Sequence, residues 1–102
     1  MKDDLHKIIS FYGVIPQLKY FQSEVFELNE AIISAEHSRC VGITRDVAPI
    51  CIEHIAEEIA DCMVMLKQFQ YYYGIEDKEI EEVMKYKIDR QLERIKEGKW
   101  KK

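Results

Sequence analysis

The chain has 102 residues, 47% of them hydrophobic and 33% charged, which is the composition of one folded domain rather than of a disordered segment. A formal net charge of −4 argues against a non-specific nucleic-acid-binding protein, because such proteins need a basic surface. The apolar runs are far shorter than a membrane span, and the opening Met1-Lys2-Asp3-Asp4 lacks the apolar core of a signal peptide. We therefore expect a cytoplasmic protein that binds neither membranes nor, stably, nucleic acids.

Glycines and prolines divide the chain into four segments. The breaks fall at Gly13 and Pro16, at Gly42 and Pro49, at Gly74, and at Gly98. The first segment covers about residues 2–12, and Pro16 suits the first turn of the next helix, where its missing N–H is not needed. The stretch 38–47 has no apolar period and is predicted to be a loop.

Apolar residues recur at steps of three and four in each longer segment, which predicts α-helices and fits no strand. These residues are Leu18, Phe21, Val25, Leu28 and Ile32 in the second, Ile55, Ile59, Cys62, Leu66, Phe69 and Tyr73 in the third, and Ile80, Met84, Ile88, Leu92 and Ile95 in the fourth. Short connections favour antiparallel neighbours. The fold class predicted is an all-α, antiparallel bundle of about four helices over residues 1–98, with a tail at 99–102. Because so short a domain buries a modest core, we expect a second chain to complete it.

Acidic residues three apart lie beside the apolar stripe in both central helices. Glu24 and Glu27 belong to the second predicted helix, and Glu58 and Asp61 belong to the third. Residues at this spacing are neighbours on a helix surface, so each pair can offer two carboxylates to one ion. Antiparallel packing would bring all four together, where a cation or bound protons must offset their repulsion. Mg²⁺ suits this role, because it prefers carboxylate oxygens and keeps water for substrate phosphates. Two solvated acidic faces are the alternative.

The residues around these pairs follow a family pattern. The first pair runs on into Leu28-Asn29-Glu30-Ala31-Ile32, and the second into Cys62-Met63-Val64-Met65-Leu66. The closing Lys87-Ile88-Asp89-Arg90-Gln91-Leu92, with Gly98, belongs to the same pattern. Over about residues 16–98 the chain resembles the MazG-like all-α nucleoside triphosphate pyrophosphohydrolases. It departs at Ser23, where many relatives carry an additional acidic residue.

The resemblance implies Mg²⁺-dependent cleavage of a nucleoside triphosphate, or of its deoxy form, to the monophosphate and pyrophosphate, with a role in sanitising the nucleotide pool. It implies that Glu24, Glu27, Glu58 and Asp61 hold the metal, that one of them positions the attacking water, and that Mn²⁺ can replace Mg²⁺. It also implies a homodimer or homotetramer.

Four further residues are candidates to contact the substrate. Arg45 lies in the predicted loop, His54 precedes Glu58 by one turn, and Lys87 and Arg90 share one side of the last helix. Each also has an ordinary explanation, since exposed loop arginines and histidines are commonly solvated and helix-terminal charges pair with nearby glutamates.

Two alternatives stay open. The chain is either an enzyme or a non-catalytic helical module that keeps the fold and binds nucleotide. A zinc site of Cys40, Cys51 and His54 is a further alternative, but closed structural zinc sites need four ligands. The sequence predicts neither the base and sugar preference nor the number of metal ions.

Overall fold

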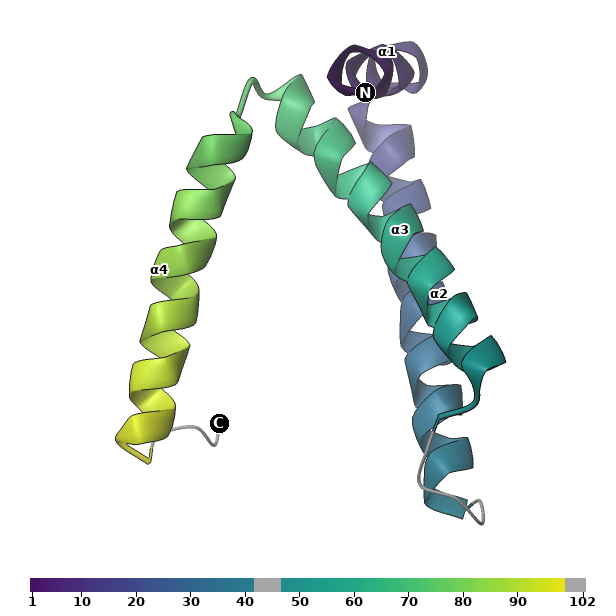
Figure 1. Cartoon of the computed structure of the whole chain (residues 1–102). Coiled ribbons are helices and arrows are strands. Elements are labelled where there is room, and N and C mark those ends of the chain that lie inside the picture. The colour runs from purple at the N-terminus through teal and green to yellow at the C-terminus, as the bar shows by residue number, and fades with distance from the viewer. Residues whose placement is uncertain (42–46, 99–102) are drawn as a thin grey trace. The chain divides into compact units, whose positions relative to one another are not determined.

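A computed structural model describes residues 1–41 and 47–98, with the backbone alone described at 39–41. These residues form four α-helices, namely α1 (Lys2–Tyr12), α2 (Val14–Val41), α3 (Pro49–Tyr72) and α4 (Asp77–Lys96) (Figure 1). No strand occurs in this part of the chain, so the all-α prediction is confirmed. Arg45 and the predicted tail at 99–102 lie outside the described residues.

The helices divide between two units. The first, Met1–Tyr72, contains α1, α2 and α3, and the second begins at Tyr73 and contains α4.

The prediction of a loop over 38–47 is wrong for residues 38–41, because α2 continues to Val41. The sequence contains no glycine or proline between Pro16 and Gly42, so nothing in the chain interrupts the backbone hydrogen bonds earlier. Pro16 lies in the first turn of α2, as predicted, and Pro49 opens α3.

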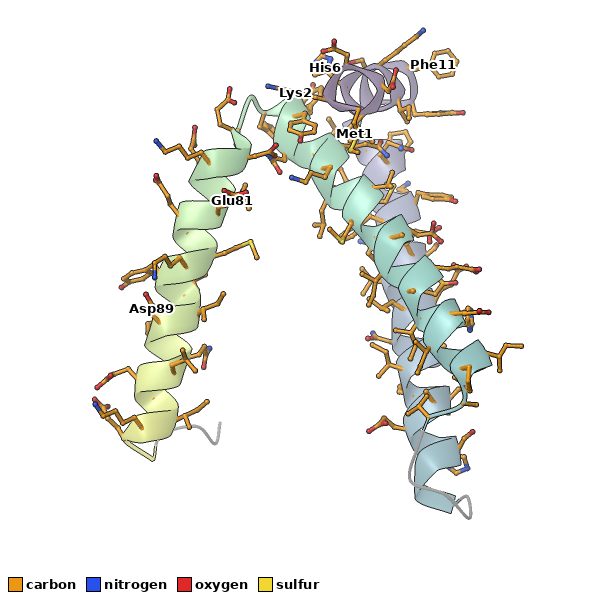
Figure 2. The ribbon with its side chains drawn as sticks, in the orientation of Figure 1. Met1, Lys2, His6, Phe11, Glu81 and Asp89 are labelled. Atoms are coloured by element: carbon orange, nitrogen blue, oxygen red, sulfur yellow. The ribbon has the colours of Figure 1, made fainter. Side chains whose placement is uncertain are left out.

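In the first unit, α2 and α3 lie side by side and run in opposite directions, and α1 crosses the end where α2 begins and α3 finishes (Figure 1). The Phe21 and Phe69 rings meet edge to face, with centroids 5.7 Å apart. On α1, Leu5 and Ile9 are buried, and Ile9 is 0% exposed. The His6 ring stacks on Tyr72, whereas Phe11 projects away from the packed helices (Figure 2).

The faces by which α2 and α3 pack differ from the predicted stripes. Of the predicted stripe residues, Leu18, Ile32, Ile59, Leu66 and Tyr73 are exposed. The buried positions are Glu24, Ala31 and Ala35 on α2 and Glu58, Cys62, Met65, Gln68, Gln70 and Tyr71 on α3. At 100° per residue, the face of α2 defined by its buried residues, and that of α3 defined by Glu58, Cys62, Met65 and Gln68, are each turned by roughly 80° from the predicted one. Small alanines on α2 allow close approach of the helices on this side, and the rotation moves two glutamates from the border of the interface to its centre.

In the second unit, α4 has the charge pattern predicted for it. Asp77 and Glu79 occupy its first turn and Arg94 and Lys96 its last, which complements the helix dipole. No residue of α4 is buried. Along its surface, Lys85 pairs with Asp89 at 3.3 Å. Among the helices described, none is both long enough and apolar enough to cross a membrane.

The burial of Ile9 generates a first prediction. Ile9→Ala should lower the free energy of unfolding of the first unit by about 2–4 kcal/mol, because it leaves a cavity where α1 meets the other helices. Urea denaturation followed by circular dichroism measures this change. Ile15→Ala is the matched control, because Ile15 is 61% exposed and should change stability by less than about 0.5 kcal/mol. Equal effects of the two variants would contradict the packing of α1.

Candidate metal centre

Three carboxylates from two helices meet between α2 and α3. Glu24 and Glu27 project from adjacent turns of α2, and Glu58 faces them from α3. One carboxylate oxygen of each residue lies within 4.8 Å of the others. The antiparallel packing of the helices brings together groups more than 30 positions apart in the sequence.

Two of these carboxylates are buried. Glu24 is 5% exposed and Glu58 is 9% exposed, whereas Glu27 is exposed. The Oε2 atoms of Glu24 and Glu58 are both shielded from solvent and have no hydrogen-bond partner among the described residues. Buried polar atoms nearly always have partners, and a buried charge without one is strongly destabilising. These two oxygens therefore need a positive or proton-donating group at this place.

Two side chains already contact the cluster. The Tyr20 hydroxyl donates a hydrogen bond to Glu24, and this bond, together with the negative charge of Glu24, raises the Tyr20 pKa above 10.0. His54 Nε2 lies 3.3 Å from Glu58 Oε1, although the His54 side chain is 58% exposed. The candidate contact His54 is thus placed against the cluster, while Tyr20 is a neighbour that the sequence analysis missed.

Asp61 lies outside the group of three, although the sequence analysis predicted four carboxylates at one point. Its side chain is exposed on α3, one turn beyond Glu58. Its negative charge nevertheless acts on Tyr20 and on Cys62. The structure therefore brings Glu24, Glu27 and Glu58 together and places Asp61 at their margin.

The donor set fits a hard divalent cation. Three carboxylates provide oxygen ligands, which Mg²⁺ and Mn²⁺ prefer, and the two unpartnered oxygens are acceptors that a cation would satisfy. The group contains no thiol or imidazole, which argues against zinc at this position. Of the alternative zinc ligands, Cys51 is half-buried on α3, and the side chain of Cys40 lies outside the described residues.

A hollow of about 600 Å³ adjoins the cluster within the first unit. Glu24 and Asp61 belong to its wall together with Tyr20, Gln17 and Gln68. The apolar part of the wall consists of Ile8, Tyr12, Pro16, Val64 and Met65. This hollow could not be predicted from the sequence, because its lining comes from three helices and follows no local motif. The only indication of it in the sequence is the pair Gln17 and Gln68, polar residues on the sides by which the two helices pack.

The remaining candidate substrate contacts are not tested by this geometry. Lys87 and Arg90 lie on α4 with exposed side chains, and the Arg90 guanidinium is stacked 5.8 Å from the centre of the Tyr86 ring. Their contact with phosphates stays a prediction.

The unpartnered carboxylates predict a metal-dependent stability. Mg²⁺ or Mn²⁺ should raise the melting temperature, by the equivalent of about 1.4 kcal/mol at ten times Kd. Glu24→Gln should raise the melting temperature in EDTA, because it removes one buried charge, and should abolish the response to metal. Thermal unfolding with and without metal measures both effects. Glu30→Gln, an exposed change on the same helix, should leave them unaltered. A wild-type melting temperature indifferent to both cations would contradict a metal site.

The cluster also affects the reactivity of Cys62. Burial, followed by the charges of Glu24 and Glu58, raises the Cys62 pKa above 9.0. The folded state thus favours the protonated thiol, and this contribution to stability is present below about pH 9 and is lost as the pH rises through the folded pKa.

In a Cys40→Ser/Cys51→Ser variant, Cys62 is the only thiol. At roughly pH 8 we expect it to react with a disulfide reagent at least about tenfold more slowly than Cys51 does in a variant where Cys51 is the only thiol. The reason is that the thiolate is the nucleophile. Cys40→Ser/Cys62→Ala provides the Cys51 reference. Denaturant should equalise the two rates, and equal rates in the folded protein would contradict the placement of Cys62.

Comparisons of the chain with protein-family models, with curated proteins and with solved structures give no match. The resemblance to MazG-like pyrophosphohydrolases therefore depends on the two acidic motifs and the residues that flank them. Membership of that family is a proposal.

Proposed function

We propose that the protein is a Mg²⁺-dependent nucleoside triphosphate pyrophosphohydrolase of the MazG-like kind. The observation that carries this proposal is the meeting of Glu24, Glu27 and Glu58 within 4.8 Å, with two carboxylate oxygens buried and unpartnered in the described part of the chain. Such an arrangement is costly unless a cation is bound, and a carboxylate-bound Mg²⁺ characteristically serves phosphate chemistry. The adjoining hollow provides room for a substrate.

The three clustered glutamates would hold the ion. Bound there, Mg²⁺ would supply positive charge to the triphosphate oxygens. The His54 imidazole steadies Glu58 at 3.3 Å, and the Tyr20 hydroxyl steadies Glu24, so two of the three ligands are oriented by neighbours. These contacts favour a fixed arrangement of the ligand oxygens.

Asp61 is the proposed acceptor for the proton of the attacking water. Its carboxylate is exposed, lines the hollow and lies outside the ligand group, so it is available to substrate and solvent. The water oxygen forms a bond to the α-phosphorus while the bond from that phosphorus to the α–β bridging oxygen breaks. The products are a nucleoside monophosphate and pyrophosphate, and the water proton passes to Asp61.

The proposal includes a cytoplasmic homodimer or homotetramer. Its support is the set of apolar residues that the first unit leaves exposed, among them Leu18, Ile32, Ile59 and Leu66. Large exposed apolar side chains are typical of surfaces that another chain covers.

Pyrophosphate release from a panel of ribo- and deoxynucleoside triphosphates with Mg²⁺ tests the function. Glu58→Gln should lower kcat/KM by roughly 100-fold or more, because loss even of groups that merely support a metal ligand costs 10- to 100-fold. Glu57→Gln changes the neighbouring exposed glutamate and should retain wild-type activity.

Full activity in Glu58→Gln would show that the site is wrongly assigned. If the wild type hydrolyses no triphosphate although Mg²⁺ raises its melting temperature, the protein is instead a non-catalytic binding module.

A further inference from the structure

The hollow beside the carboxylates has two chemically distinct ends. Glu24 and Asp61 provide negative charge at one end, while the Gln17 and Gln68 amides lie at the other. Gln17 and Glu24 are seven residues apart on α2, which is two helical turns or about 10 Å. That span is comparable with the distance between the outer edge of a nucleobase and the 5′-phosphate of the same nucleotide.

The amides hold one another in a defined orientation. Gln17 Nε2 donates a hydrogen bond of 2.7 Å to Gln68 Oε1. Gln68 is 2% exposed, and its own Nε2 lies 3.6 Å from Met65 Sδ, so its carbonyl oxygen is directed at Gln17. If the Gln17 amide were flipped, its Oε1 would lie against Gln68 Oε1, and the two acceptors would repel each other.

This orientation determines what Gln17 offers to a ligand. A primary amide has two N–H donors and one carbonyl acceptor, and the bond to Gln68 uses one donor. One further N–H and the carbonyl Oε1 are not used by this bond and remain to pair with a ligand. Glutamine pairs in this bidentate manner with a base edge that presents a donor next to an acceptor.

The rest of the wall suits a planar heterocycle. Tyr12 and Tyr20 contribute aromatic rings, and Ile8, Val64 and Met65 contribute apolar surface. Binding pockets for small molecules commonly combine an apolar lining with a few fixed polar groups. Aromatic and apolar faces bind the faces of a base, and the amide binds its edge.

We propose that the hollow receives the nucleobase of the triphosphate and that Gln17 determines base preference through paired hydrogen bonds, in an orientation set by Gln68. This inference rests on the function proposed above, because it assigns the base end of the same substrate. It adds a specificity-determining residue at the base end of the hollow to the carboxylates proposed at the phosphate end.

Kinetics with single substrates provide the first test. Gln17→Leu should lower kcat/KM for the preferred base about 10- to 100-fold, mainly through KM, since a bidentate contact of this kind discriminates by about that factor. The difference between bases should shrink at the same time. Gln22→Leu is the matched control on the same helix, because Gln22 is exposed and lies outside the hollow. An unchanged order of base preference in Gln17→Leu would overturn the inference.

Binding of nucleosides, which lack phosphates, separates this inference from the proposed hydrolysis. Titration of the wild-type protein with uridine, cytidine, thymidine, adenosine and guanosine should shift the side-chain amide NMR signals of Gln17 and Gln68, and should leave that of Gln22 in place. If these signals shift although no triphosphate is hydrolysed, the base site stands and the hydrolase proposal fails. If pyrophosphate is released but no nucleoside shifts the signals up to its solubility limit, the base site fails and the hydrolase stands.

Discussion

The constraint that organises this molecule is the placement of two carboxylates at the centre of a helix interface. Glu24 and Glu58 occupy positions of α2 and α3 where a helical pair ordinarily has leucine or alanine, and each has an unpartnered oxygen within the described structure. Hydrophobic burial at this interface is correspondingly modest, with Ala31 and Ala35 on one helix and Met65 on the other. Stability lost to buried charge in this manner is characteristic of functional sites, where fold and chemistry have opposing requirements.

The surrounding groups respond to the same concentration of negative charge. The Tyr20 hydroxyl and the His54 imidazole lie against its two buried members. Beside them, burial and then the charges of Glu24 and Glu58 raise the pKa of the Cys62 thiol. Charge falls away toward the glutamine end of the hollow, where the polar groups are neutral amides. A ligand with an anionic end and a neutral heterocyclic end, joined to a cation, complements this gradient along the helix pair.

The sequence predicts the elements of the fold well and their relative rotation poorly. Glycine and proline positions mark the breaks between helices, because these residues act through local backbone geometry. Gly13 precedes α2, Pro49 opens α3, and Gly74 lies between α3 and α4. The packing faces depend on which of two apolar faces meets a neighbour. Ile59 and Leu66 are as apolar as any core residue, yet the structure leaves them exposed and buries Glu58. Of the four carboxylates in the two acidic pairs, Glu24, Glu27 and Glu58 lie together. The separation of Asp61, and the hydrogen bond between Gln17 and Gln68, depend on contacts between distant segments that no local pattern contains.

The elbow at Gly13 connects the start of the chain to this arrangement. Gly13 has a φ of 92°, which side chains other than glycine rarely adopt. Its N–H binds Ile9 O at the end of α1, and its carbonyl oxygen accepts the backbone N–H of Gln17 at 3.2 Å. One residue therefore fixes both the angle at which Ile8 and Tyr12 enter the hollow and the first turn of the helix that presents the Gln17 amide. Gly13 therefore controls the shape of the hollow although it is not part of its wall. A change of backbone angle at Gly13 would displace Ile8, Tyr12 and Gln17 and leave the cluster of Glu24, Glu27 and Glu58 in place.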